Sequence, residues 1–260
     1  MNILEEIAGR ARERVSAGKL SVPIEKMISM AKVVGTCPSF EDALRAEGIS
    51  FICEVKKASP SKGIIAGDFP YLEIASDYEK AGAAAISVLT EPFYFKGENR
   101  FLWEIAEEVD IPILRKDFTV DSYMIYEAKA LGASAVLLIC SILDSGELKS
   151  YIELAHELGL SALVEAHDEA EILMAIEAGA RIIGVNNRDL KSFKVDMRNS
   201  IRLRRLVPGD IIFVSESGIQ TAGDVAVLNE SGVDAVLIGE TLMRSKDKKA
   251  ELDRMKGGLR

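Results

Sequence analysis

The sequence predicts an α/β fold, a closed (β/α)8 TIM barrel preceded by an N-terminal helical extension. Eight short apolar, β-branched runs alternate along the chain with longer segments of helical period. The length of 260 residues also suits a barrel of this kind, which needs about 250 residues and forms a single domain. The alternation of strands and helices is also compatible with an open, doubly wound sheet, which is the alternative fold.

We expect the eight apolar runs to be the barrel strands; in chain order they are 49–57, 84–90, 111–116, 135–140, 162–165, 182–185, 211–214 and 235–238. Four of them follow closely on a glycine that can end the preceding helix in the left-handed conformation: Gly82, Gly132, Gly179 and Gly232. These glycines recur at intervals of roughly 50 residues, which fits two βα units per interval.

Helix-start signals stand between the predicted strands. Three pairs have capping-box spacing: Asp144 with Glu147, Asp168 with Glu171, and Thr221 with Asp224. No linker rich in Pro, Gly or Ser interrupts the pattern. We therefore expect one domain over 1–260, with the helical extension in 1–47 and the barrel in 48–260.

Composition excludes several classes of partner. A net charge of −9 without a stripe of Lys and Arg argues against nucleic acid. No apolar run is long enough for a membrane span, and the charged first 19 residues do not suit a signal peptide, so we expect a cytoplasmic protein. The few, widely spaced cysteines and histidines predict reduced thiols and no structural metal.

Charged residues recur where the predicted strands end. Glu54 and Lys56 alternate onto one side of the first strand, as an acid–base pair or as a structural ion pair. Similar groups end four more strands: Lys116 with Asp117, Glu165, Asn186 with Arg188, and Glu216 with Ser217. Because the βα loops at the carboxyl ends of barrel strands build the active site, this recurrence predicts one there.

Two glycine-containing turns suggest a phosphate site. Ser217-Gly218 follows the seventh predicted strand and Gly239-Glu240 follows the eighth, where backbone N–H groups can face an anion. Turn chemistry alone is the alternative. His167 is expected to be a loop histidine with its hydrogen bonds satisfied, a base being the alternative; Cys53 is expected to face the helices as a core residue, and Trp103 to serve packing.

Seven motifs together resemble the indole-3-glycerol phosphate synthase family of tryptophan biosynthesis: EVKKASPSKG, LTEPFYFKG, ILRKDF, LVEAH, GVNNRDL, SESGI and LIGETLM. The resemblance spans nearly the whole chain, and ILEEIAGRARERV is similar to the family's helical extension over part of the barrel mouth. It implies a carboxy-lyase that closes the ring of 1-(2-carboxyphenylamino)-1-deoxyribulose 5-phosphate, releasing carbon dioxide and water without a metal or organic cofactor.

The resemblance also implies roles for individual residues. Lys116 becomes the general acid of ring closure and Glu165 a general base or proton shuttle. Lys56, oriented by Glu54, becomes the holder of the substrate carboxylate and an alternative acid, and the sequence leaves open which lysine serves which step. A crowded, positive, partly desolvated site would favour proton release from such a lysine. The remaining residues implied are Asn186, Arg188 and Ser217 around the reacting centre, Ser59, Ser217, Gly218, Gly239 and Glu240 at the phosphate, and Phe95, Phe118 and Leu190 around the aromatic ring.

Other functions remain open at this stage. The phosphoribosylanthranilate isomerase and the tryptophan synthase α-subunit are phosphate-handling barrels of the same pathway, and a barrel that only binds a phosphorylated ligand is a third possibility. The loop at Lys62-Gly63 is expected to move on substrate binding. Association with other enzymes of the pathway is possible, and the sequence does not predict an oligomeric state.

Overall fold

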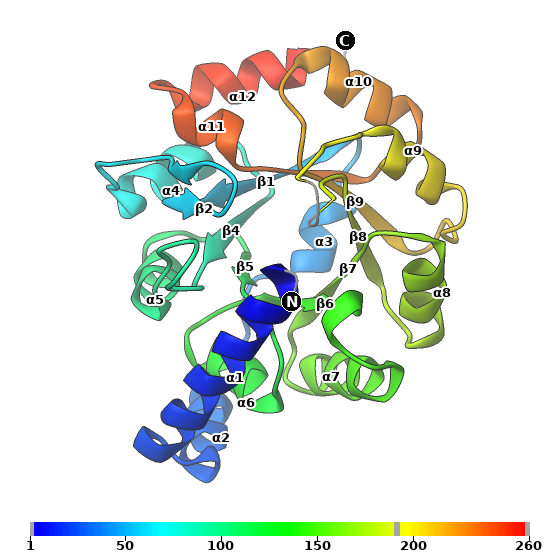
Figure 1. The fold of residues 1–260 in the computed structure, drawn as a ribbon. Coiled ribbons are helices and arrows are strands. Elements are labelled where there is room, and N and C mark those ends of the chain that lie inside the picture. Colours follow the sequence, from blue (N-terminus) through cyan, green and yellow to red (C-terminus); the bar gives the residue numbers. More distant parts are fainter. Residues whose placement is uncertain (1–2, 190–192, 258–260) are drawn as a thin grey trace.

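The computed structural model describes residues 3–189 and 193–257, which form a closed barrel of eight parallel strands (Figure 1). The barrel strands are β1 (Ser50–Val55), β4 (Ala85–Leu89), β5 (Ile113–Lys116), β6 (Ala135–Ile139), β7 (Ser161–Ala166), β8 (Ile182–Asn186), β9 (Ile212–Glu216) and β10 (Ala235–Ile238). Because β1 pairs with both β10 and β4, the sheet has no edge and the open-sheet alternative is wrong.

Helices surround the barrel as an outer ring (Figure 1). They are α4 (Tyr71–Lys80), α5 (Asn99–Glu108), α6 (Ser122–Ala130), α7 (Ser145–Glu157), α8 (Glu169–Glu177), α9 (Arg198–Arg204), α10 (Ala222–Glu230), α11 (Glu240–Arg244) and α12 (Lys248–Lys256), with a 3-10 turn, η1 (Cys140–Ile142), after β6. The predicted helix-ending glycines have φ between 77° and 87°, which confirms the left-handed conformation for Gly82, Gly132, Gly179 and Gly232.

Three helices precede the first strand: α1 (Ile3–Ser21), α2 (Ile24–Val33) and α3 (Phe40–Leu44). The amino-terminal end of α1 lies over the middle of the barrel (Figure 1), and α2 packs against α6. Two ion pairs of 2.7 Å attach α1 to the barrel, one between Arg14 and Asp117 and one between Lys19 and Asp121. The predicted helical extension is therefore present and covers part of the mouth.

The side chains of each strand alternate between two cores. One core fills the barrel and includes Ile52 and Val214, whereas the other lies between strands and helices and includes Cys53 and Phe213. Cys53 is fully buried as predicted, and burial raises the pKa of its thiol to about 12. Trp103 on α5, which was expected to serve packing, is 51% exposed, so its packing is partial.

Some boundaries and caps differ from the sequence prediction. β1 ends at Val55, and the chain then forms a small hairpin of β2 (Ala58–Ser59) and β3 (Gly63–Ile64). The capping boxes at Asp144 and Thr221 are complete. At α8 the Asp168 side chain accepts from the N–H of Glu171, but the Glu171 carboxylate accepts from His167. Among the described residues, no helix combines the length and apolarity that crossing a membrane requires.

Candidate active site

A cavity of about 1320 Å3 opens at the carboxyl ends of the barrel strands. Ile3, Leu4 and Ile7 of α1 form part of its wall, and the remaining wall comes from strand ends, βα loops and residues of α9, α10 and α11. Most of the predicted site residues line it: Lys116, Glu165, Lys56, Glu54, Asn186, Arg188, Ser217, Ser59, Gly218, Gly239, Glu240, Phe95 and Phe118. Leu190, the remaining predicted residue, lies outside the described residues.

Strand alternation places a layer of charge inside the barrel. Glu54, Lys116, Glu165 and Glu216 each follow by two positions a residue of the inner core, namely Ile52, Leu114, Leu163 and Val214. The side chains of all four charged residues contact the cavity, although the three glutamates are at most 3% exposed. The layer therefore combines an apolar floor with ionisable groups that face the ligand space.

Lys116 lies at the centre of this layer. Its Nζ is 3.0 Å from Glu165 Oε2 and 3.1 Å from Glu216 Oε2. Burial would lower the pKa of Lys116, but the two carboxylates outweigh it and raise the pKa above the ordinary lysine value. The predicted positive surroundings of Lys116 are wrong, because its neighbours are acidic and hold the proton in place.

The two carboxylates that flank Lys116 differ in their acidity. Burial raises the pKa of Glu216 to about 7 despite the nearby ammonium, because Glu165 adds a second negative charge. Burial also disfavours the ionised form of Glu165, but Lys116 and His167 outweigh it and hold the pKa below its usual value. Two carboxyl groups of opposite shift beside one lysine are suited to proton transfer near neutral pH.

Glu54 and Lys56 form an ion pair inside the cavity, as the spacing of the first strand predicted. The backbone of Gly239 approaches both: a Cβ atom there would clash with the Glu54 carboxylate and lie 2.8 Å from Lys56 Nζ. A glycine after β10 thus leaves room for the pair.

The predicted phosphate-site residues line one part of the cavity. Ser217 and Gly218 follow β9 with φ of 69° and 86°, a left-handed turn that Ser217 adopts without being glycine. A non-glycine residue with φ in this region occurs mainly where the surroundings require it. The Glu240 carboxylate lies 3.0 Å from Arg244 and 3.6 Å from Lys62, which joins α11 to the first βα loop.

Asn186 and Arg188 lie beside Glu165. Asn186 donates from Nδ2 to Glu165 Oε1 at 3.3 Å and accepts from the N–H of Arg188 at 3.0 Å. The Arg188 guanidinium donates to the carbonyl of Phe193 at 3.2 Å, and Arg188 lines the cavity.

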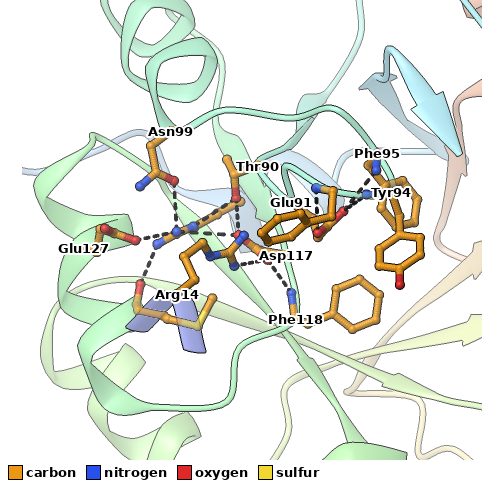
Figure 2. Close-up of polar contacts among 12 residues, drawn as sticks. Arg14, Thr90, Glu91, Tyr94, Phe95, Asn99, Asp117, Phe118 and Glu127 are labelled. Carbon is orange, nitrogen blue, oxygen red and sulfur yellow. Dashed lines mark hydrogen bonds and ion pairs between the residues drawn. The ribbon is translucent and has the colours of Figure 1, made fainter. Parts of the chain in front are cut away.

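Two aromatic rings form the predicted apolar wall. Phe95 and Phe118 lie with ring centroids 6.2 Å apart, inclined at 40°. Figure 2 shows how the loop that carries Phe95 is held: the buried Glu91 carboxylate accepts from the N–H groups of Phe93, Tyr94 and Phe95 at 2.7 to 3.0 Å. A flat apolar wall of this kind can contact an aromatic ligand.

A buried polar network lies behind Lys116 (Figure 2). The Asp117 carboxylate contacts Arg14 of α1 at 2.7 Å, the hydroxyl of Thr90 at 2.6 Å and Arg115 at 3.6 Å. Arg115 also pairs with Glu127 at 2.5 Å. The residues on both sides of Lys116 are thus fixed, which restrains the lysine between its carboxylates.

Glu216 was expected among the charged strand ends that build the active site, but the sequence assigned no role to it. Its signal was strand alternation, since Glu216 shares the parity of the inward-facing Val214. The strand was predicted to end at Val214, whereas β9 continues to Glu216. Because the predicted strand stopped two residues short of Glu216, strand alternation was not applied to this residue.

These observations define the class of protein. A closed (β/α)8 barrel whose strand ends aim buried acids, bases and cations into one cavity is the architecture of a barrel enzyme.

Comparison with known proteins gives the family. The indole-3-glycerol phosphate synthase family profile matches residues 4–255. The chain is 58% identical to the indole-3-glycerol phosphate synthase of Ruminiclostridium cellulolyticum, over 98% of this chain and 99% of the relative. It is 56% identical to that of Endomicrobium trichonymphae, over 94% and 95%. The chain belongs to the indole-3-glycerol phosphate synthase family.

Solved structures support the fold. The 3-hexulose-6-phosphate synthase of Salmonella typhimurium superposes with a TM-score of 0.67 at 18% identity, over 81% of this chain and 98% of that protein. Identity this low supports only the shared barrel architecture.

Proposed function

We infer that the chain carries out the reaction of its family, converting 1-(2-carboxyphenylamino)-1-deoxyribulose 5-phosphate into indole-3-glycerol phosphate with release of carbon dioxide and water. The observation that carries this inference is Lys116, held between Glu165 and Glu216 at 3.0 and 3.1 Å inside the cavity. Ring closure requires a proton donor for the ketone oxygen, and dehydration requires a base, so one lysine with two carboxylates supplies both.

We assign the acid of ring closure to Lys116. As the ring carbon attacks the ketone carbon, the ketone oxygen gains negative charge and takes the proton from Nζ. Glu216, with a pKa raised by burial to about 7, carries a proton part of the time at neutral pH and can return one to the lysine. Glu165 stays ionised beside Lys116 and acts as the base that removes the proton in dehydration.

The remaining groups hold the substrate. Lys56, oriented by Glu54, binds the carboxylate until carbon dioxide leaves, while Asn186 and Arg188 position the reacting centre. The phosphate occupies the part of the cavity lined by Ser59, Ser217, Gly218, Gly239 and Glu240, and the aromatic ring lies against Phe95 and Phe118. A small phosphorylated substrate of this shape suits a cavity of about 1320 Å3.

The other barrel enzymes of the pathway are less suitable. An isomerase would need a different acid–base pair, whereas the Glu54–Lys56 pair of β1 suits a carboxylate that must be held and then released. A cytoplasmic location, a mechanism without metal or organic cofactor, and association with other enzymes of the pathway remain predictions.

A direct assay tests the proposal. Purified protein is mixed with the carboxyphenylamino-deoxyribulose phosphate without added metal, and product is followed by indole fluorescence. We expect turnover in the wild type and a fall of about 100-fold or more in Lys116→Met, because general acid catalysis contributes roughly that factor. Lys57→Met is the matched control, since this lysine lies outside the described cavity wall, over the ring of Phe69 at 5.9 Å.

The possible outcomes of this assay test the reaction and the choice of acid separately. Substrate binding without product in the wild type would leave a phosphate-binding barrel and overturn the synthase assignment. Full activity in Lys116→Met would keep the reaction and overturn the choice of acid. Circular dichroism of each variant shows whether a loss of activity reflects a loss of fold.

A further inference from the structure

His167 lies just behind the reacting layer. It follows β7 directly, and its imidazole Nε2 is 3.4 Å from Glu165 Oε1. Its side chain keeps one-fifth of its surface exposed, but His167 is absent from the described residues that line the cavity. The imidazole therefore faces a carboxylate of the site without facing the ligand.

The position of this imidazole is fixed from the far side. The Glu171 carboxylate lies 3.0 Å from Nδ1 and accepts from the backbone N–H of His167 at 2.7 Å. Asn199 of α9 donates to the His167 carbonyl at 3.0 Å. A contact from α8 thus holds the ring and one from α9 holds its backbone, so that the other ring nitrogen lies beside Glu165.

His167 differs from the satisfied loop histidine expected from the sequence. Its Nε2 is buried and has no partner at hydrogen-bond geometry, which is an unfavourable state for a polar atom. Glu165 Oε1 lies 3.4 Å from it, so a small rotation of the imidazole or of the carboxylate would complete the bond. The other oxygen of Glu165 is already occupied by Lys116 at 3.0 Å.

The charges around His167 favour its protonated form. Burial lowers the pKa of the imidazole, but Glu171, Glu165 and Glu216 outweigh it and raise the pKa above 6.5. Cys140 of η1 also faces this region, donating to the Glu171 carbonyl, and stays neutral because burial raises the pKa of its thiol to about 12. Carboxylates on β7, α8 and β9 therefore surround one imidazole.

We propose that His167 is a positioning residue for Glu165, a link in a Glu171–His167–Glu165 chain that orients the carboxylate and keeps it ionised. In this chain Nδ1 donates to Glu171, and a small reorientation lets Nε2, 3.4 Å away, donate to Glu165 Oε1, which leaves Oε2 for Lys116 and the reacting proton. The proposal rests on the proposed function, in which Glu165 is the base. It extends that function to a residue outside the cavity.

Two substitutions separate the contacts of His167. The amide nitrogen of Gln can take the place of Nε2, whereas the shorter Asn can take only that of Nδ1. We expect His167→Asn to lower kcat by about 10- to 100-fold, the effect of losing one hydrogen bond to a charged group, with little change in KM. His167→Gln should recover most of the rate.

The pH profile gives a readout that a purely structural role would not move. Because His167 lowers the pKa of Glu165, its removal raises that pKa and shifts the acid limb of kcat/KM to higher pH. We expect this shift in both variants, since Gln restores the donor but not the positive charge. An unchanged acid limb in both variants would overturn the proposal.

The pairing can also be measured without turnover. The chain has two histidines, so the imidazole NMR signals of His167 and His156 can be assigned from a His156→Asn variant. We expect the pKa of His167 to fall in Glu165→Gln while that of His156 stays constant. A His167 pKa indifferent to Glu165→Gln would overturn the inference. A coupled pKa in a protein that forms no product would support the His167–Glu165 contact and overturn the proposed function instead.

Discussion

Lys116 illustrates how a single residue can serve both stability and chemistry. Its ammonium compensates two carboxylates that the barrel buries, so the three side chains carry one net negative charge when Glu216 is ionised and none when it is protonated. A substrate with a carboxylate and a phosphate would meet repulsion there. Other cations at the cavity wall, Lys56, Lys62 and Arg188 among them, oppose that repulsion locally, although the whole chain carries −9.

At Gly239 the addition of a single methyl group is expected to disturb the site. We expect Gly239→Ala to reduce kcat/KM by about 10-fold or more, because the new Cβ would displace the Glu54–Lys56 pair and small misplacements in a site have large effects. Steady-state kinetics measure the change. Gly209→Ala is the control, since nothing lies within 4 Å of a Cβ there, and it should retain full activity. Equal activity in the two variants would mean that the pair tolerates displacement.

Most of the individual site residues could be predicted from the sequence, because a strand end is a local signal. Lys116, Glu165 and Lys56 follow apolar runs, and alternation gives their direction. The role of His167 could not be predicted, since its direction depends on contacts from α8 and α9. The acidic surroundings of Lys116 also come from strands far apart in the chain, which local patterns do not show.

At the scale of elements, α1 is part of the site through Arg14. Its guanidinium lies 2.7 Å from the buried carboxylate of Asp117, the residue after Lys116. Burial disfavours the ionised form of Asp117, but Arg14 and Arg115 outweigh it and lower the pKa. A lowered pKa in the folded protein stabilises it above the unfolded pKa, and this contribution is lost as pH falls through the folded value.

We therefore expect Arg14→Met to reduce the free energy of unfolding at neutral pH by about 1–3 kcal/mol, since Asp117 keeps Arg115 and Thr90 as partners. Acid unfolding should begin at a higher pH, because the pKa of Asp117 rises. Urea titrations between pH 3 and 7 measure both effects. Lys19→Met is the control, because the Lys19–Asp121 pair has the same 2.7 Å distance but is more exposed and should contribute less than about 1 kcal/mol. Equal losses would contradict the role of burial.

Helices and strands were well predicted where a sequence pattern repeats along the chain. All eight strands and the four glycine helix ends were identified, because alternation and left-handed glycines are local properties. The hairpin of β2 and β3 was missed, since two-residue strands have no period to detect. The half-exposure of Trp103 was not predicted, because it depends on which face of α5 packs against the barrel.

At the scale of the whole molecule, the barrel buries a layer of charged side chains, and the members of this layer contribute to stability with opposite signs. Glu165 on β7 and Glu216 on β9 both contact Lys116, but their pKa values shift in opposite directions. The fold therefore favours the ionised form of Glu165 and the protonated form of Glu216 at the same pH. A site tuned in this way exchanges some stability for reactivity.

The last prediction compares the two carboxylates directly. The folded pKa of Glu216, about 7, lies above the usual value of 4.5, so the wild type loses stability as pH rises from 4.5 through 7. Glu216→Gln removes this loss and should raise the free energy of unfolding at pH 8 by about 1–3 kcal/mol while lowering turnover. Glu165→Gln is the matched variant of opposite sign: it removes a group that stabilises the fold above its unfolded pKa, so stability at pH 8 should fall. Urea unfolding at pH 5 and 8 measures both differences. If the two variants change stability in the same direction at pH 8, the opposed tuning of the pair is wrong, and Lys116 would then hold both carboxylates equally.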